Sequence, residues 1–139
     1  MADLAKIARE YLETWNSRDW DKYRGFLHDG YSYTGGDGNR MDGPDAGVGV
    51  GQMFATALPD GKINIKHVHA SDNTVVVEFH GTGTHTGDFA GVPGSGRKVS
   101  INVCDVIEFR DGKVFAEREY IDMLTMMQQI GAIPEGATA

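Results

Sequence analysis

The sequence predicts an α+β fold in which N-terminal helices precede an antiparallel sheet. Between residues 4 and 15 the apolar residues recur at every third or fourth position, which is typical of an amphipathic helix. From residue 62 onward, runs rich in β-branched residues predict strands. Asp111-Gly112 lies between two such runs and favours a two-residue hairpin turn. The length of 139 residues predicts one domain, spanning 1–139.

The N-terminal third holds the predicted helices. Asp3 can cap a first helix over residues 4–15, and Asp19 can cap a short second helix that ends before Gly30. A third helix is expected over residues 44–58, although each of its three glycines costs roughly 1 kcal/mol against alanine.

The rest of the chain is expected to be mainly β. A short strand covers residues 31–34, residues 86–97 form a long Gly-rich loop, and a tail helix covers residues 123–130. Four longer strands are expected in two hairpins, at residues 63–70, 74–85, 99–109 and 114–122.

The second hairpin predicts a face with an unusual charge pattern. A two-residue turn sets Arg110 opposite Lys113, and strict pairing from there places four polar groups at the far end of an otherwise apolar face. Those groups are Asp105, Arg118, Tyr120 and Asp122. Asp105 would lie opposite Arg118, so an ion pair is favoured there over catalysis. Asp122 has no such partner, and either proton transfer or capping of the tail helix would explain it.

The first hairpin is expected to have a three-residue turn. That register places His67 and His69 on the apolar side, where His85 joins them. Three histidines could bind zinc, but histidines of the core or the pocket rim are favoured because no other metal motif accompanies them. No metal and no cofactor are therefore expected.

Charge and cysteine content narrow the possible partners. The formal net charge of -7 argues against binding to nucleic acid or to an anionic membrane surface. One cysteine, Cys104, allows no internal disulfide, and the N-terminus has no signal-peptide pattern. The expected location is the cytoplasm.

The C-terminal half contains a set of short segments that form a recognisable pattern: Gly83-Thr84-His85-Thr86-Gly87, Gly91-Val92-Pro93 with Gly96-Arg97, residues 105–114, residues 118–122 and Gln129-Ile130-Gly131. Through these segments the chain resembles the SnoaL-like polyketide cyclase family of the nuclear-transport-factor-2-like superfamily. The resemblance implies a cone-shaped barrel whose curved antiparallel sheet wraps around the N-terminal helices. It also implies cofactor-free ring closure by intramolecular aldol condensation. Asp122 matches the family's general acid/base, and Asp105 matches a polar pocket position.

These observations lead to one main hypothesis and two alternatives. The main hypothesis is an acid/base enzyme of the cyclase or isomerase kind acting on a small apolar carbonyl compound. The predicted catalytic residues are Asp122, Asp105, Tyr120 and His85. The predicted substrate-binding residues are Trp15, Tyr31, Tyr33, His67, Val103 and Arg118. The alternatives are a small-molecule binding module without turnover and an epoxide hydrolase-like site built from Asp105, Arg118 and Asp122. A homodimer formed through the outer sheet face is also expected.

Overall fold

The computed structural model describes residues 3–134 and contains every helix and strand that the sequence predicts. Two details differ: the first strand begins earlier, and a short strand lies in the Gly-rich stretch. The elements are α1 (Leu4–Ser17), α2 (Trp20–Gly25), β1 (Leu27–Thr34), β2 (Arg40–Asp42), α3 (Pro44–Ala57), β3 (Lys62–Ser71), β4 (Thr74–His85), β5 (Arg97–Arg110), β6 (Lys113–Ile121) and α4 (Met123–Gln129).

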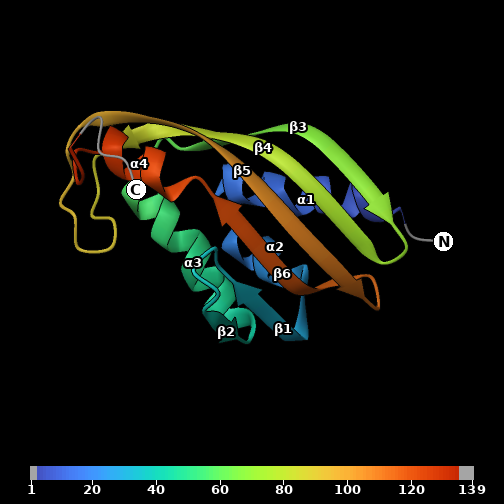
Figure 1. Ribbon diagram of the computed structural model, residues 1–139. Helices are drawn as coiled ribbons and strands as arrows, with labels where there is room; N and C mark the ends of the chain where they lie inside the picture. The colour runs from blue at the N-terminus through green and yellow to red at the C-terminus, as the bar shows by residue number, and fades with distance from the viewer. Residues whose placement is uncertain (1–2, 135–139) are drawn as a thin grey trace.

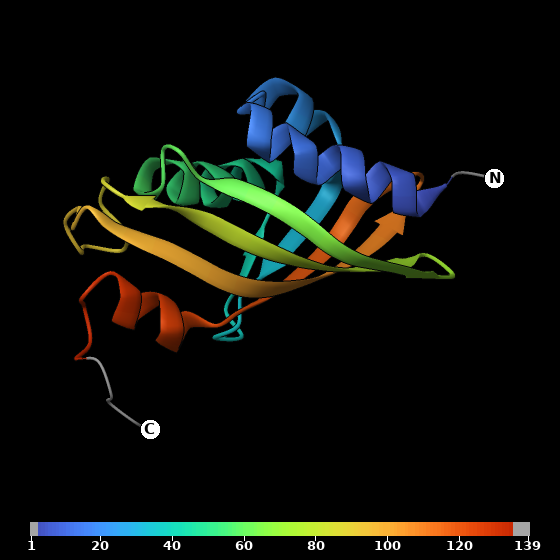
Figure 2. The same ribbon diagram turned by 90° about the horizontal axis from the view of Figure 1, so that it is seen from above.

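A curved and open sheet of six strands organises the molecule (Figure 1). The strand order is β2-β1-β6-β5-β4-β3, and β1 runs parallel to β6 while the other neighbouring strands are antiparallel. Helices α1, α2 and α3 lie on one side of the sheet and α4 lies on the other (Figure 2). Among residues 3–134, no helix is long and apolar enough to cross a membrane.

Local capping and packing hold the helices against the sheet. The Asp3 carboxylate accepts from the Lys6 amide at 3.2 Å, and the Asp19 carboxylate accepts from the Lys22 amide at 3.1 Å, as the sequence predicts. One buried stripe of α1, which includes Tyr11, packs into the main core. Burial of this stripe orients α1 along the sheet.

Gly47 allows α3 to approach β1 closely. A Cβ at this position would lie 2.5 Å from Tyr31 Cε1 and 2.9 Å from Leu27 Cδ1. At Gly49, on the other side of the same helix, no atom lies within 4 Å of a Cβ. The glycine at position 47 therefore has a packing reason, which offsets its low helix propensity.

The β5–β6 turn is the predicted one, but the register beyond it is not. Arg110 pairs with Lys113, and positive φ values at Asp111 (54°) and Gly112 (73°) are typical of a type I′ turn. Phe109 pairs with Val114, but Glu108 then pairs with Ala116, so Phe115 has no partner. This residue forms a β-bulge.

The bulge exchanges the two faces of β6. The Phe115 ring lies outside, with the Arg110 guanidinium 3.8 Å from its centroid and the His28 ring edge-on at 5.2 Å. Beyond it, Glu119 lies opposite Asp105, and Arg118 lies opposite Val106. The predicted pairing of Asp105 with Arg118 is therefore wrong, because one extra residue shifts all later side chains to the other face.

The β3–β4 hairpin differs from its predicted register for the same physical reason. Its turn contains two residues, with Ser71 opposite Thr74, and Lys66 is an unpaired bulge residue in β3. His67 and His69 consequently lie exposed on the outer face, with their rings stacked at 6.4 Å. The prediction that they share the apolar side with His85 is wrong.

Candidate functional site

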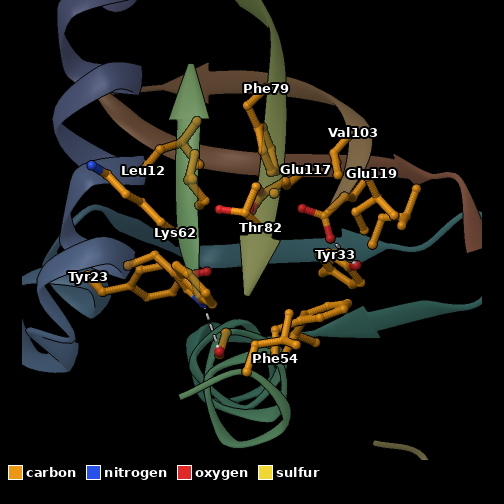
Figure 3. Close-up of a pocket in the computed structure, with 18 residues that line it drawn as sticks. Leu12, Tyr23, Tyr33, Phe54, Lys62, Phe79, Thr82, Val103, Glu117 and Glu119 are labelled. Carbon is orange, nitrogen blue, oxygen red and sulfur yellow. Dashed lines mark hydrogen bonds between the residues drawn. The ribbon is translucent and has the colours of Figure 1, made fainter. Parts of the chain in front are cut away.

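A cavity lies between helices α1–α3 and the inner face of the sheet (Figure 3). Including its open mouth, it contains about 710 Å³ of space that no atom occupies. Its walls are mainly apolar and aromatic, and its polar end lies on β6. The larger wall residues are Leu12, Trp15, Tyr23, Tyr33, Phe54, Leu58, Phe79, Ile101, Val103 and Ile121, and the ionisable residues are Lys62, Glu117 and Glu119.

Glu119 is a titratable carboxyl that lines this cavity. Its side chain points to Tyr33, whose hydroxyl donates to Glu119 Oε1 at 2.9 Å (Figure 3). Burial and the neighbouring charge of Glu117 raise the pKa of Glu119 to about 7, and the Tyr33 hydrogen bond opposes part of that shift. A carboxyl group with this pKa can accept or release a proton near neutral pH.

Glu117 lies deeper, among three tyrosines. The hydroxyls of Tyr11 and Tyr31 donate to Glu117 Oε1 at 2.8 and 2.7 Å, and the Tyr11 and Tyr23 hydroxyls share a hydrogen bond of 3.0 Å. Burial, followed by the charge of Glu117, raises the pKa of Tyr11 and of Tyr31. The tyrosines therefore remain protonated and act as donors to the carboxylate.

Asp105 completes a group of three neighbouring carboxyls. It is 0% exposed and accepts no hydrogen bond among residues 3–134, but in its protonated form it can donate one to the neighbouring Glu117. Burial, followed by the charge of Glu117, raises its pKa well above the usual range. Three carboxylates this close cannot all be charged without compensation, so the group binds protons jointly.

The spacing of these carboxyls would also admit a cation. One oxygen from each of Asp105, Glu117 and Glu119 lies within 4.8 Å of the others. Hard divalent ions, however, take six or more oxygen ligands, and tyrosine protons already point at two of the three carboxyls. The donor set therefore fits shared protons better than a bound metal ion.

Part of the predicted site is present in this cavity. Trp15, Tyr33 and Val103 line it. Tyr31 and Asp105 lie directly behind its wall, where each is in reach of Glu117. The four strand residues lie on this side because the regular part of the sheet turns the inner residues of β1 and β5 toward the helices, and Trp15 lies on the buried stripe of α1.

The remaining predicted residues lie elsewhere. Arg118 forms an ion pair with Glu108 on the outer face, and Tyr120 is 52% exposed. Asp122 is exposed and caps α4, accepting from the Thr125 amide at 3.1 Å and from its hydroxyl at 2.7 Å. These hydrogen bonds lower the pKa of Asp122, which is the opposite of what a proton-transfer role would require.

Neither of the predicted histidines, His67 and His85, lies in the cavity, and the epoxide hydrolase-like site is not formed. His67 is on the outer face, and His85 is buried beside Ser95, whose hydroxyl lies 2.9 Å from His85 Nδ1; neither lines the cavity. The epoxide hydrolase-like site required convergence of Asp105, Arg118 and Asp122. Because only Asp105 faces inward, that arrangement is not formed.

Glu117 and Glu119 are the functional residues that sequence analysis missed. Strict alternation from the turn put both on the outer face, and the bulge at Phe115 reverses that assignment. A signal for them did exist in the tyrosines. Buried tyrosine hydroxyls need acceptors. Tyr11 lies on the apolar stripe of the first helix, and Tyr31 and Tyr33 lie two residues apart on a predicted strand, so all three could point into the same interior.

Comparisons with known proteins identify a family and a relative of this chain. The family model of the SnoaL-like polyketide cyclases matches residues 5–130. Aklanonic acid methyl ester cyclase DnrD of Streptomyces peucetius is 24% identical over 143 residues, which cover 98% of each chain.

Solved structures resemble the fold over nearly its whole length. AclR of Streptomyces galilaeus has a TM-score of 0.87 at 25% identity and covers 99% of this chain and 87% of its own. TsrD of Streptomyces laurentii has a TM-score of 0.83 at 19% identity, covering 96% and 99%. Together with the family match, these similarities define the fold as nuclear-transport-factor-2-like, and the chain belongs to the SnoaL-like polyketide cyclase family.

Proposed function

We propose that this protein is a cofactor-independent acid/base enzyme that acts on a small apolar carbonyl compound, with Glu119 as the proton acceptor. The observation that carries the proposal is the position of Glu119. It lies in an apolar cavity, it is oriented by Tyr33, and its pKa of about 7 matches the requirement for general base catalysis.

The proposed reaction begins with removal of a proton from carbon next to a carbonyl group. The C–H bond breaks, its electron pair forms the enolate, and the proton binds to the Glu119 carboxylate. In a cyclisation, the enolate carbon then attacks a second carbonyl of the same molecule, and the resulting alkoxide takes the proton back from Glu119. In an isomerisation, the proton returns to a different carbon.

The surrounding groups tune this proton transfer. Tyr33 stabilises the carboxylate form of Glu119, while the nearby charge of Glu117 stabilises its protonated form. The buried Asp105 sits against both glutamates and holds a proton that limits the total negative charge. The three carboxyls thereby keep Glu119 able to exchange protons near neutral pH.

The family supports the same kind of activity. DnrD is by name a cyclase of aklanonic acid methyl ester, and it aligns with this chain over 98% of both lengths. The apolar walls formed by Trp15, Phe54 and Phe79 fit a flat ring system, which favours an aromatic ketone as the substrate class.

Solvent exchange at carbon tests the proposal directly. A panel containing 2-tetralone, related aromatic ketones and aklanonic acid methyl ester is incubated with the protein in D₂O. Deuterium uptake at the carbon next to the carbonyl is followed by NMR, and any cyclised product by mass spectrometry. Glu119→Gln should lower the exchange rate by about 10²–10⁴-fold, the usual contribution of a general base.

Asp122→Asn provides the matched control, because it changes a carboxyl on the same strand end that lies outside the cavity. It should retain the wild-type exchange rate. If Asp122→Asn lost activity and Glu119→Gln kept it, the assignment of Glu119 would be wrong. If panel members bound without any exchange or turnover, the non-catalytic binding module would be the better description.

We also propose that the protein forms a homodimer through the outer side of the sheet. Strict alternation from the turn would place Glu117, Glu119 and Ile121 on the outer face, but the bulge at Phe115 turns them to the inner side. The exposed apolar side chains near that face are now Tyr120, Met123 and Leu124. Light scattering at micromolar concentrations distinguishes a dimer from a monomer.

A further inference from the structure

The charges that face the cavity are strongly unbalanced. Glu117 and Glu119 of β6 line the cavity, and Asp105 of β5 lies directly behind them. Lys62 of β3 is the cation that lines the cavity, and Arg18 is held elsewhere by the carbonyls of Trp15, Leu58, Pro59 and Gly61. The other titratable groups facing the carboxyls are neutral tyrosine hydroxyls from α1, α2 and β1: Tyr11, Tyr23, Tyr31 and Tyr33.

Lys62 does not neutralise these carboxyls. Its side chain is exposed, and its ammonium group lies toward α1, on the side of the cavity away from Glu119 (Figure 3). Within residues 3–134, no ion pair joins Lys62 to Glu117 or Glu119. The cavity therefore contains an acidic end without a protein counter-ion.

The carboxyls also have unused hydrogen-bond acceptors. The tyrosine hydroxyls donate to Glu117 Oε1 and Glu119 Oε1, which leaves the second oxygen of each glutamate without a described donor. Asp105 lies behind the cavity wall beside Glu117, and a proton held there is shared with that glutamate. The second oxygen of Glu119, which lines the cavity beside Tyr33, remains available to a donor that enters from outside.

The aromatic walls of the cavity are also suited to a cation. Trp15, Tyr23, Phe54 and Phe79 line the same cavity as the glutamates. The negative faces of such rings attract organic cations, and the attraction grows when water is excluded. An anionic ligand would instead meet like charges in an apolar environment, where their repulsion is poorly screened.

We infer that the cavity selects an apolar ring compound that carries a protonated amine or an iminium group, bound against Glu119. This inference rests on the proposed function, because it specifies the substrate class of that same site. An amine N–H would donate to the unused carboxylate oxygens, while the ring skeleton would fill the space between the aromatic walls.

Cation binding and proton binding must then oppose each other. A bound ammonium group stabilises the charged form of the carboxyls, so protons held by Asp105 and Glu119 are released as the amine binds. A neutral ligand of equal shape releases none. The number of protons released is therefore a direct indicator of where the cation binds.

Calorimetry with three matched ligands tests the inference on the full chain. The ligands are 2-aminotetralin, 2-tetralol and tetralin-2-carboxylate, which share one ring skeleton and differ in charge. At pH 7, in two buffers of different ionisation enthalpy, the amine should bind at least about 10-fold more tightly than the alcohol, equivalent to about 1.4 kcal/mol. It should also release protons, and the carboxylate should bind most weakly.

Two variants locate the effect. Glu119→Gln should remove most of the preference for the amine, whereas Glu78→Gln, on the exposed outer face of β4, should leave it unchanged. The inference is overturned if the alcohol binds as tightly as the amine, if no protons are released, or if Mn²⁺ binds the carboxyl group and the amine does not.

The outcomes separate this inference from the proposed function. Loss of solvent exchange in Glu119→Gln together with equal binding of amine and alcohol would keep the enzyme and remove the cationic substrate. A clear amine preference with unchanged exchange in Glu119→Gln would keep the cation site and remove Glu119 as the base.

Discussion

The two faces of the β5–β6 hairpin carry charges in opposite ways. On the outer face, Glu108 forms an ion pair with Arg118, and both side chains are more than one third exposed. On the inner face, Asp105, Glu117 and Glu119 gather without a cation, and two of the three are buried. The same two strands thus hold one compensated and one uncompensated set of charges, only a few residues apart.

This difference separates a structural feature from a functional one. An exposed ion pair is easily accommodated and contributes little to stability, because water already solvates both partners. Buried carboxyls without a counter-ion cost free energy that the fold must supply from its core. Sites with such unfavourable groups are those where shifted pKa values serve catalysis or binding. We therefore assign function to the inner face.

The largest effect is expected on the inner face from Glu117→Leu, which removes the acceptor of the Tyr11 and Tyr31 hydroxyls. Two buried hydroxyl protons would then lack a partner, and each unpaired buried donor costs about 1–3 kcal/mol. The free energy of unfolding should therefore fall by more than for any change on the outer face. Circular dichroism and thermal melting would measure it.

Phe115→Ala is the outer-face control, since it removes only the ring that Arg110 and His28 contact. It should cost about 1 kcal/mol, the scale of an exposed cation–π contact. A Glu117→Leu variant that is as stable as Phe115→Ala would show that the inner hydrogen-bond network contributes no more than an exposed outer contact.

The bulge at Phe115 marks the limit of what the sequence could predict. Helix caps at Asp3 and Asp19, the type I′ turn at Asp111-Gly112 and the strand positions follow from local residue preferences, and the structure confirms them. A bulge depends on outer-face contacts of Phe115 with residues from another strand and from the turn. Alternation along β6 alone contains no indication of it.

The candidate site was predictable where it depends on regular structure. Trp15, Tyr33 and Val103 lie in the cavity because α1, β1 and β5 follow their expected periodicity up to that point. Asp122 was misassigned because the two explanations for it, capping and proton transfer, have the same local pattern. Its hydrogen bonds to Thr125 favour capping.

An intermediate effect is expected from Asp105→Asn, which removes one inner carboxyl at nearly constant shape. The folded pKa of Asp105 lies above its unfolded value of about 3.9, so its favourable contribution is present below that pH and is lost as the pH rises through the folded pKa. Glu119 acts in the same direction, with a folded pKa of about 7. Wild-type stability should therefore fall between about pH 4 and neutral pH.

Urea denaturation at several pH values from 4 to 8 measures this slope. The Asp105→Asn variant should be flatter than the wild type, gaining relative stability toward pH 8 by about 1.4 kcal/mol for each unit by which folding raises the pKa. Part of the slope should persist through Glu119. Parallel curves for variant and wild type would mean that Asp105 is not protonated in the folded protein.

The smallest effect is expected on the outer face, where Glu108→Gln removes the charge that pairs with Arg118. Because both side chains are partly solvated, the free energy of unfolding should change by less than about 1 kcal/mol. A double-mutant cycle with Arg118→Met should give a coupling of about 0.2–1 kcal/mol that decreases in high salt, as expected for charges that ions can screen. A coupling above about 2 kcal/mol, or one that salt does not reduce, would mean that the outer pair is as strongly desolvated as the inner carboxyls, and the contrast between the two faces would no longer distinguish function from structure.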